Sequence, residues 1–157
     1  MPVSRATLVS TFAAAAVLGL GTATLGWAKG RFFAPVKDPV IAKECGACHM
    51  AYPAGLLPAA SWSAIVAGLD NHFGENASVD AAMAAKLTAY LTKNAEAGKA
   101  VSARTGTVAL RITEIDWFVQ RHGKNRLSPE RLARKGAKSA AQCQACHNQA
   151  EQGYFED

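Results

Sequence analysis

Four cysteines and two of the four histidines fall into two short motifs of one pattern. The motifs are Cys45-Gly46-Ala47-Cys48-His49 and Cys143-Gln144-Ala145-Cys146-His147, and they use every cysteine of the chain. CxxCH is the attachment signature of c-type haem. Two thiols at this spacing lie on one helical turn and can reach both vinyl groups of a porphyrin, while the following histidine can bind the iron. The sequence therefore predicts two covalently attached haems, held by Cys45, Cys48, Cys143 and Cys146.

Other uses of paired cysteines explain these motifs less well. A zinc ribbon usually places its two CxxC pairs ~15–20 residues apart, whereas most of the chain separates Cys48 from Cys143. A thioredoxin-like redox motif needs one CxxC inside a βαβ pattern, and no strand pattern surrounds either motif. Structural disulfides leave the histidine after each pair unexplained. Haem attachment is therefore preferred over all three.

Two histidines, His72 and His122, remain as ligands for the second axial position of each iron. Each is predicted to end a short amphipathic helix, the first capped by Ser61 and the second by Thr113. A histidine on an apolar stripe needs a partner for its ring nitrogens, and a haem iron supplies one. The predicted iron ligands are therefore His49, His72, His122 and His147.

Methionine is the competing distal ligand. Met50 is adjacent to His49 and cannot cross to the far face of the same haem. Met83 could reach, but it belongs to an apolar stripe typical of a helix core. His72 is therefore preferred over Met83, and no methionine in the second half of the chain competes with His122.

The proximal and distal histidines can pair locally or across the chain. Local pairing, which joins His49 to His72 and His147 to His122, is preferred because it needs only short loop closures. The crossed pairing stays open if the two halves interleave. In both arrangements every axial position has a candidate ligand. Two irons without an open position favour an electron-transfer protein over an enzyme or a gas sensor.

The N-terminus is typical of an exported protein. Arg5 precedes an uncharged stretch, residues 6–28, with an apolar centre and small residues near its end. We predict a signal peptide at residues 1–28. The stretch is also long enough for an uncleaved anchor, which takes ~20 apolar residues, although its threonines, serine and glycines favour cleavage. The predicted location is the periplasm, where bacterial c-type haem is attached, with membrane contact only if the leader is retained.

The rest of the chain predicts a mainly α-helical fold. Two small helical haem-binding domains would each be built around one covalently attached haem, which supplies apolar core that so short a chain lacks. The boundary is predicted near residues 98–106, so the first domain covers residues 29–98 and the second covers residues 99–157. Helix starts are predicted at Asp38, Ser78, Ser128 and Ser139.

Positive charge is concentrated in the second half. Residues 99–138 contain ten Lys and Arg side chains against three acidic ones, whereas residues 29–98 contain six of each. One or two of these cations can neutralise haem propionates. The surplus predicts a docking face for an acidic protein partner, because complementary charge raises association rates. Nucleic acid is a poor partner for an exported haem protein.

The motifs and their surroundings resemble the dihaem cytochrome c family of bacterial periplasmic electron carriers. Residues 44–53, 62–77, 112–122 and 143–157 carry the resemblance. It implies a two-domain, low-spin cytochrome with bis-histidine ligation, which shuttles electrons between redox proteins by outer-sphere transfer. Family members pass electrons to an oxygen-binding monohaem cytochrome c and are associated with membrane b-type cytochromes. We therefore expect a monohaem c-type cytochrome as acceptor and a membrane b-type cytochrome as donor.

Overall fold

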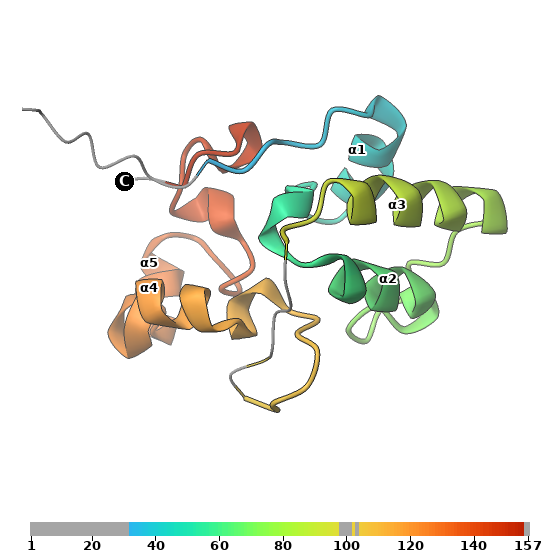
Figure 1. Cartoon of the computed structure of the whole chain (residues 1–157). Coiled ribbons are helices and arrows are strands. Elements are labelled where there is room, and N and C mark those ends of the chain that lie inside the picture. The colour runs from blue at the N-terminus through green and yellow to red at the C-terminus, as the bar shows by residue number, and fades with distance from the viewer. Residues whose placement is uncertain (1–31, 98–101, 103, 156–157) are drawn as a thin grey trace, which may run out of the picture.

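The fold was obtained as a computed structural model, which describes residues 32–97, 102 and 104–155 (Figure 1). Its helices are α1 (Pro39–Gly46), α2 (Ala59–Ala67), α3 (Ala81–Lys93), α4 (Asp116–Arg126) and α5 (Pro129–Arg134). Single 3-10 turns lie between and after them, at Ala54–Leu56, Leu69–Asn71, Ile112–Glu114, Cys143–Ala145 and Ala150–Gln152. Over the described ranges the only β-structure is isolated bridges, so the prediction of a mainly α fold is confirmed.

The predicted signal peptide, residues 1–28, lies outside the described residues. None of the helices in the described part is long and apolar enough to cross a bilayer. The predicted domain boundary also falls largely on residues that the structure does not describe, and the division into two domains stays a prediction.

Helix α1 begins at its predicted cap. The Asp38 carboxylate accepts hydrogen bonds from the backbone N–H groups of Val40, at 2.9 Å, and Ile41, at 3.2 Å. Pro39 occupies the first helical position, where its missing N–H costs nothing. The same carboxylate pairs with Lys86 of α3 at 3.1 Å. The cap therefore also ties α1 to α3, and α1 carries Cys45 near its end.

The hydrophobic core is centred on α2 and α3, which pack along each other on one side of the molecule (Figure 1). Trp62 and Val66 of α2 and Leu87 and Leu91 of α3 are buried. The core continues into the second half of the chain through Ala109, Ile115 and Phe118. One continuous core therefore joins α2 and α3 to α1, through Ile41, and to the first turn of α4.

Helix α2 differs from its prediction at both ends. It begins at Ala59 after Pro58, whose extended backbone (φ −74°, ψ 161°) precedes the first turn without a side-chain cap. Ser61 lies inside the helix, and its buried Oγ has no hydrogen-bond partner among the described residues. The helix ends at Gly68, so His72 follows it in a separate turn. The Ser61 cap was wrong because Pro58 had already set the helix start.

Two other predicted caps are also displaced. Asp80 rather than Ser78 caps α3, since its carboxylate accepts from the Met83 N–H at 2.8 Å. Thr113 lies in a 3-10 turn, and α4 begins after Ile115 without a side-chain cap. The prediction at Ser128 is confirmed, because its hydroxyl accepts from the Arg131 N–H at the start of α5.

The two ends of the described chain meet. The segment before α1 runs beside the C-terminal segment (Figure 1), and the Phe33 N–H donates to the Gly153 carbonyl oxygen at 2.9 Å. The Phe33 ring lies between Trp117 and Phe155, with centroid separations of 5.9 and 5.7 Å. This contact holds the beginning of the described chain against its C-terminal half.

Gly153→Ala is expected to destabilise the protein far more than Gly136→Ala. Both glycines have positive φ, 89° and 68°, a conformation that costs an L-residue ~1–2 kcal/mol. A Cβ at Gly153 would also overlap the Phe33 carbonyl, whereas nothing lies within 4 Å at Gly136. Urea unfolding of both holoprotein variants measures the difference. Equal losses would contradict close packing of Phe33 on Gly153.

Candidate haem sites

The four predicted iron ligands lie in two facing pairs. The ring centroids of His49 and His72 are 6.3 Å apart, with 29° between the ring planes. Those of His122 and His147 are 6.0 Å apart, with 89° between the planes. These are the local pairs preferred from the sequence. Met83, the competing ligand, instead packs against the hydrophobic core.

The separation within each pair suits one metal ion between two imidazoles. A histidine nitrogen binds a metal at about 2 Å and the ring centre lies about 1 Å farther back, so two rings on opposite sides of one ion have centres about 6 Å apart. The centroid separations of 6.3 and 6.0 Å match this value. The chain therefore fits a haem iron at both pairs.

A bare metal ion has less support. Across the described ranges, no group of three or more His, Cys, Asp or Glu side chains is placed to hold one. The four cysteines are free thiols and half-buried or exposed, which leaves them available for haem attachment. This arrangement disfavours the zinc and disulfide alternatives considered from the sequence.

The first attachment segment follows directly from α1. Cys45 lies near the end of the helix and Cys48 is exposed just beyond it. Burial, with a smaller contribution from the neighbouring Glu44 carboxylate, raises the pKa of the Cys45 thiol. Both thiols therefore lie at one helix end, with His49 directly after them.

The second attachment segment is a 3-10 turn rather than the predicted helix. Gln142 takes a turn conformation (φ −82°, ψ 68°) just before it, and the Ser139 hydroxyl closes a local turn by accepting from the Ala141 N–H. The His147 N–H donates to the Cys143 carbonyl at 2.8 Å, so the motif still completes one turn. Burial raises the pKa of the Cys143 thiol to about 11.

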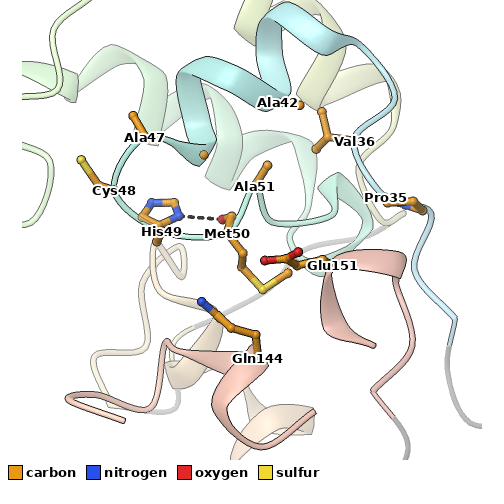
Figure 2. Close-up of a pocket in the computed structure, with 11 residues that line it drawn as sticks. Pro35, Val36, Ala42, Ala47, Cys48, His49, Met50, Ala51, Gln144 and Glu151 are labelled. Atoms are coloured by element: carbon orange, nitrogen blue, oxygen red, sulfur yellow. Dashed lines mark hydrogen bonds between the residues drawn. The ribbon is translucent and has the colours of Figure 1, made fainter. Parts of the chain in front are cut away.

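Backbone carbonyls orient one histidine of each pair. Nδ1 of His49 lies 2.7 Å from the Met50 carbonyl oxygen, as Figure 2 shows, and Nδ1 of His122 lies 2.9 Å from the Phe118 carbonyl oxygen. A carbonyl can only accept, so each Nδ1 donates its hydrogen. Nε2 is then left as the metal-binding nitrogen, in a fixed tautomer and ring orientation.

His72 is held by a tight turn instead of a helix. Its N–H donates to the Glu75 carbonyl at 2.7 Å, and the Glu75 N–H donates back at 3.2 Å. Phe73 within this turn has a positive φ of 57°. Burial, and then the nearby His49 and Arg111, lower the pKa of His72. These neighbours favour the neutral imidazole, which is the form that binds a metal.

Arg111 was not singled out from the sequence. Its guanidinium lies 4.0 Å from the centroid of the Phe73 ring, and that ring packs on His72 at 4.7 Å. Arg111 therefore brings a positive charge from the second half of the chain to the first histidine pair. The only sequence signal was its membership of the basic stretch at residues 99–138.

Tyr52 was also missed. Its ring stacks on His49, with a centroid separation of 4.6 Å and 23° between the planes. Its hydroxyl donates to the Ala141 carbonyl oxygen at 2.7 Å. Burial, with a smaller contribution from Cys143, raises the pKa of Tyr52 to about 12. The sequence signals were its place in the stretch 44–53, which resembles the family, and its position three residues after the proximal histidine.

A cavity of about 440 Å³ separates the two attachment segments. Figure 2 shows His49 and Met50 on one side and Gln144, from the second motif, on the other, with the Glu151 carboxylate at the edge. The two CxxCH motifs therefore face one shared space, although 94 residues of sequence lie between Cys48 and Cys143.

Comparison with known proteins gives consistent matches. The family model described as dihaem cytochrome c matches residues 41–155. The chain is similar to the crystal structure of DHC purified from Rhodobacter sphaeroides, with 45% identity over 77% of this chain and 99% of that chain and a TM-score of 0.65. It is also similar to a diheme cytochrome type c from Shewanella baltica, with 41% identity over 74% and 85% of the two chains and a TM-score of 0.60. The search among curated proteins found no match.

Proposed function

Because the chain belongs to the dihaem cytochrome c family, we propose that it is a periplasmic carrier that shuttles electrons between redox proteins by outer-sphere transfer. The family implies an electron-transfer protein with two c-type haems. Bis-histidine, low-spin ligation at both haems is the finer part of the proposal. The observation that carries it is the two facing histidine pairs, whose ring centroids lie 6.3 and 6.0 Å apart.

The residues divide into attachment and ligation roles. Cys45 and Cys48 would attach the first haem, and Cys143 and Cys146 the second. His49 and His72 would bind one iron, and His147 and His122 the other. Bound haem iron supplies a reversible one-electron change between its ferric and ferrous states.

The protein's own contribution is to hold the ligand rings rigidly. The Nδ1–H groups of His49 and His122 donate to backbone carbonyls, and Phe118 stacks on His122. Rings fixed in this way need little rearrangement when the iron changes charge. If these histidines bound both axial positions of each iron, no open position would remain for oxygen, nitric oxide or peroxide. This supports electron carriage rather than catalysis or gas sensing.

Partner choice is proposed from charge and from the family resemblance. Six cations of α4, α5 and the following loop are exposed, and none forms an ion pair with another described residue: Arg121, Arg126, Arg131, Arg134, Lys135 and Lys138. These six residues are called the basic face below. We propose that an acidic monohaem c-type cytochrome docks there as acceptor, with a membrane b-type cytochrome as donor.

Export of the protein is proposed from residues 1–28. Their basic start, apolar centre and small residues near the end support cleavage as a signal peptide. The mature protein would then be free in the periplasm, and contact with the membrane would require retention of the leader.

Low-temperature EPR of the oxidised wild-type protein tests the ligation. Two low-spin ferric signals per chain and no high-spin signal are expected, because both irons have two strong axial ligands. The reduced protein should also leave its visible spectrum unchanged under carbon monoxide. A high-spin signal, or carbon monoxide binding at either haem, would instead favour an enzyme or a gas sensor.

A further inference from the structure

One side chain connects the two haem sites through direct contacts. The Tyr52 ring stacks on His49 at 4.6 Å, and the Tyr52 hydroxyl donates to the Ala141 carbonyl at 2.7 Å, across 89 residues of sequence. The Cys143 N–H donates to the same carbonyl at 3.0 Å. The contacts therefore run without a gap from a ligand of the first iron to an attachment residue of the second haem.

The Ala141 carbonyl is the point where this connection is made. This carbonyl accepts from the Tyr52 hydroxyl and from the Cys143 N–H. The Cys143 thiol lies 3.5 Å from the same oxygen and can also donate to it. Attachment of the haem would convert this thiol to a thioether, which has no hydrogen to donate. The Tyr52 hydroxyl and the Cys143 N–H would then be the remaining donors to the Ala141 carbonyl. The second attachment segment is a 3-10 turn rather than an α-helix. The hydrogen bond from the Tyr52 hydroxyl to Ala141 holds this segment against the first site.

We propose that Tyr52 is a positioning residue that fixes the two haem sites relative to each other and provides the contact route for electron exchange between them. This inference rests on the proposed electron-carrier function. In the exchange one electron leaves the ferrous iron of one haem and enters the ferric iron of the other. No bond is formed or broken, no proton moves, and Tyr52 is itself neither oxidised nor reduced.

The chain offers a matched control for the loss of one tyrosine hydroxyl. Tyr90 also bonds the backbone through its hydroxyl, which accepts from the Lys37 N–H at 2.9 Å. That bond joins α3 to the segment before α1, so both of its partners lie in the first half of the chain. Tyr52→Phe and Tyr90→Phe therefore each remove one hydroxyl and one hydrogen bond, but only the first interrupts the connection between the sites.

Two measurements on the holoprotein test the proposal. Tyr52→Phe should raise amide hydrogen exchange over residues 139–147 about fivefold, the effect of losing one neutral hydrogen bond. It should also slow electron exchange between the haems several-fold, measured by NMR exchange spectroscopy of the haem methyl groups in partly reduced protein. Tyr90→Phe should leave both quantities at the wild-type level.

A second variant distinguishes the contribution of the Tyr52 ring from that of its hydroxyl. Tyr52→Leu removes the stacking on His49 as well, so the EPR g-values of the first haem should shift and the exchange should slow further. In Tyr52→Phe both low-spin signals should persist, because the ring and the iron ligands remain. Unchanged hydrogen exchange in Tyr52→Phe, or electron exchange at the wild-type rate, would overturn the proposal. Failure of the proposed ligation would appear separately, as a missing low-spin signal in the wild type.

Discussion

Replacing His72 with alanine should turn the first haem high-spin and open it to carbon monoxide, while the second haem keeps its low-spin spectrum. The His72 ring faces His49 at a separation that fits one iron, and a methyl group cannot bind that iron. Met83, the competing ligand considered from the sequence, packs against the hydrophobic core and is not expected to replace it. EPR should therefore lose one of its two low-spin signals completely.

His122→Ala is the matched control for this prediction. It removes the corresponding ring of the other pair, which faces His147, so the second haem should respond and the first should not. Carbon monoxide titration counts the opened sites, with one expected per chain in each variant. A response of the second haem to His72→Ala would show crossed pairing, and a response of neither haem would exclude His72 as a ligand.

The haem attachment motifs could be predicted from sequence because their chemistry is local. The two thiols and the histidine of each motif lie within one turn of the backbone, so the pattern survives even though the second motif adopts a 3-10 turn instead of a helix. The caps at Asp38 and Ser128 are equally local. In both, a short polar side chain precedes proline at the first helical position, and both predictions are confirmed.

The predicted helix ends were wrong where two neighbouring residues could each begin or end the helix. Ser78 and Asp80 are both good caps, and the helix begins after the second of them. Ser61 follows Pro58 by three residues, and the proline determined the start of α2. Gly68 and Gly74 can both end a helix, and the chain uses the earlier one. Local helix propensity does not determine which of two such residues begins or ends the helix, because tertiary packing decides between them.

The contacts that join the two halves could not be predicted, because they join single residues far apart in the sequence and leave no periodic pattern in it. Tyr52 reaches Ala141 across 89 residues, and Arg111 reaches Phe73 from beyond the predicted boundary. Pattern analysis finds side chains that share one element, whereas these pairs meet only after separate elements have packed. The tuning of the first site by a cation from the second half therefore emerged only from the fold.

The basic face should control the rate at which the protein meets an acidic redox partner. Arg131, Arg134 and Lys135 are exposed on and just after α5, which lies at the end of the molecule away from α2 and α3 (Figure 1). Electrostatic steering raises association rates about 10- to 1,000-fold. Reversing these three residues to Glu should therefore slow electron transfer to an acidic monohaem c-type cytochrome ~10-fold or more at low salt, measured by stopped flow.

This prediction depends on where the charges lie and not on the net charge of the protein. Lys37, Lys43 and Lys93 are exposed in the first half, and their reversal to Glu changes the net charge by the same amount. That control should slow the reaction much less, because its charges lie away from the basic face. At ~1 M salt the Debye length is near 3 Å, so the difference between the triple variants should vanish. Equal slowing by both would mean that net charge alone steers the partner, and a reaction indifferent to salt and to both reversals would exclude electrostatic docking at the basic face.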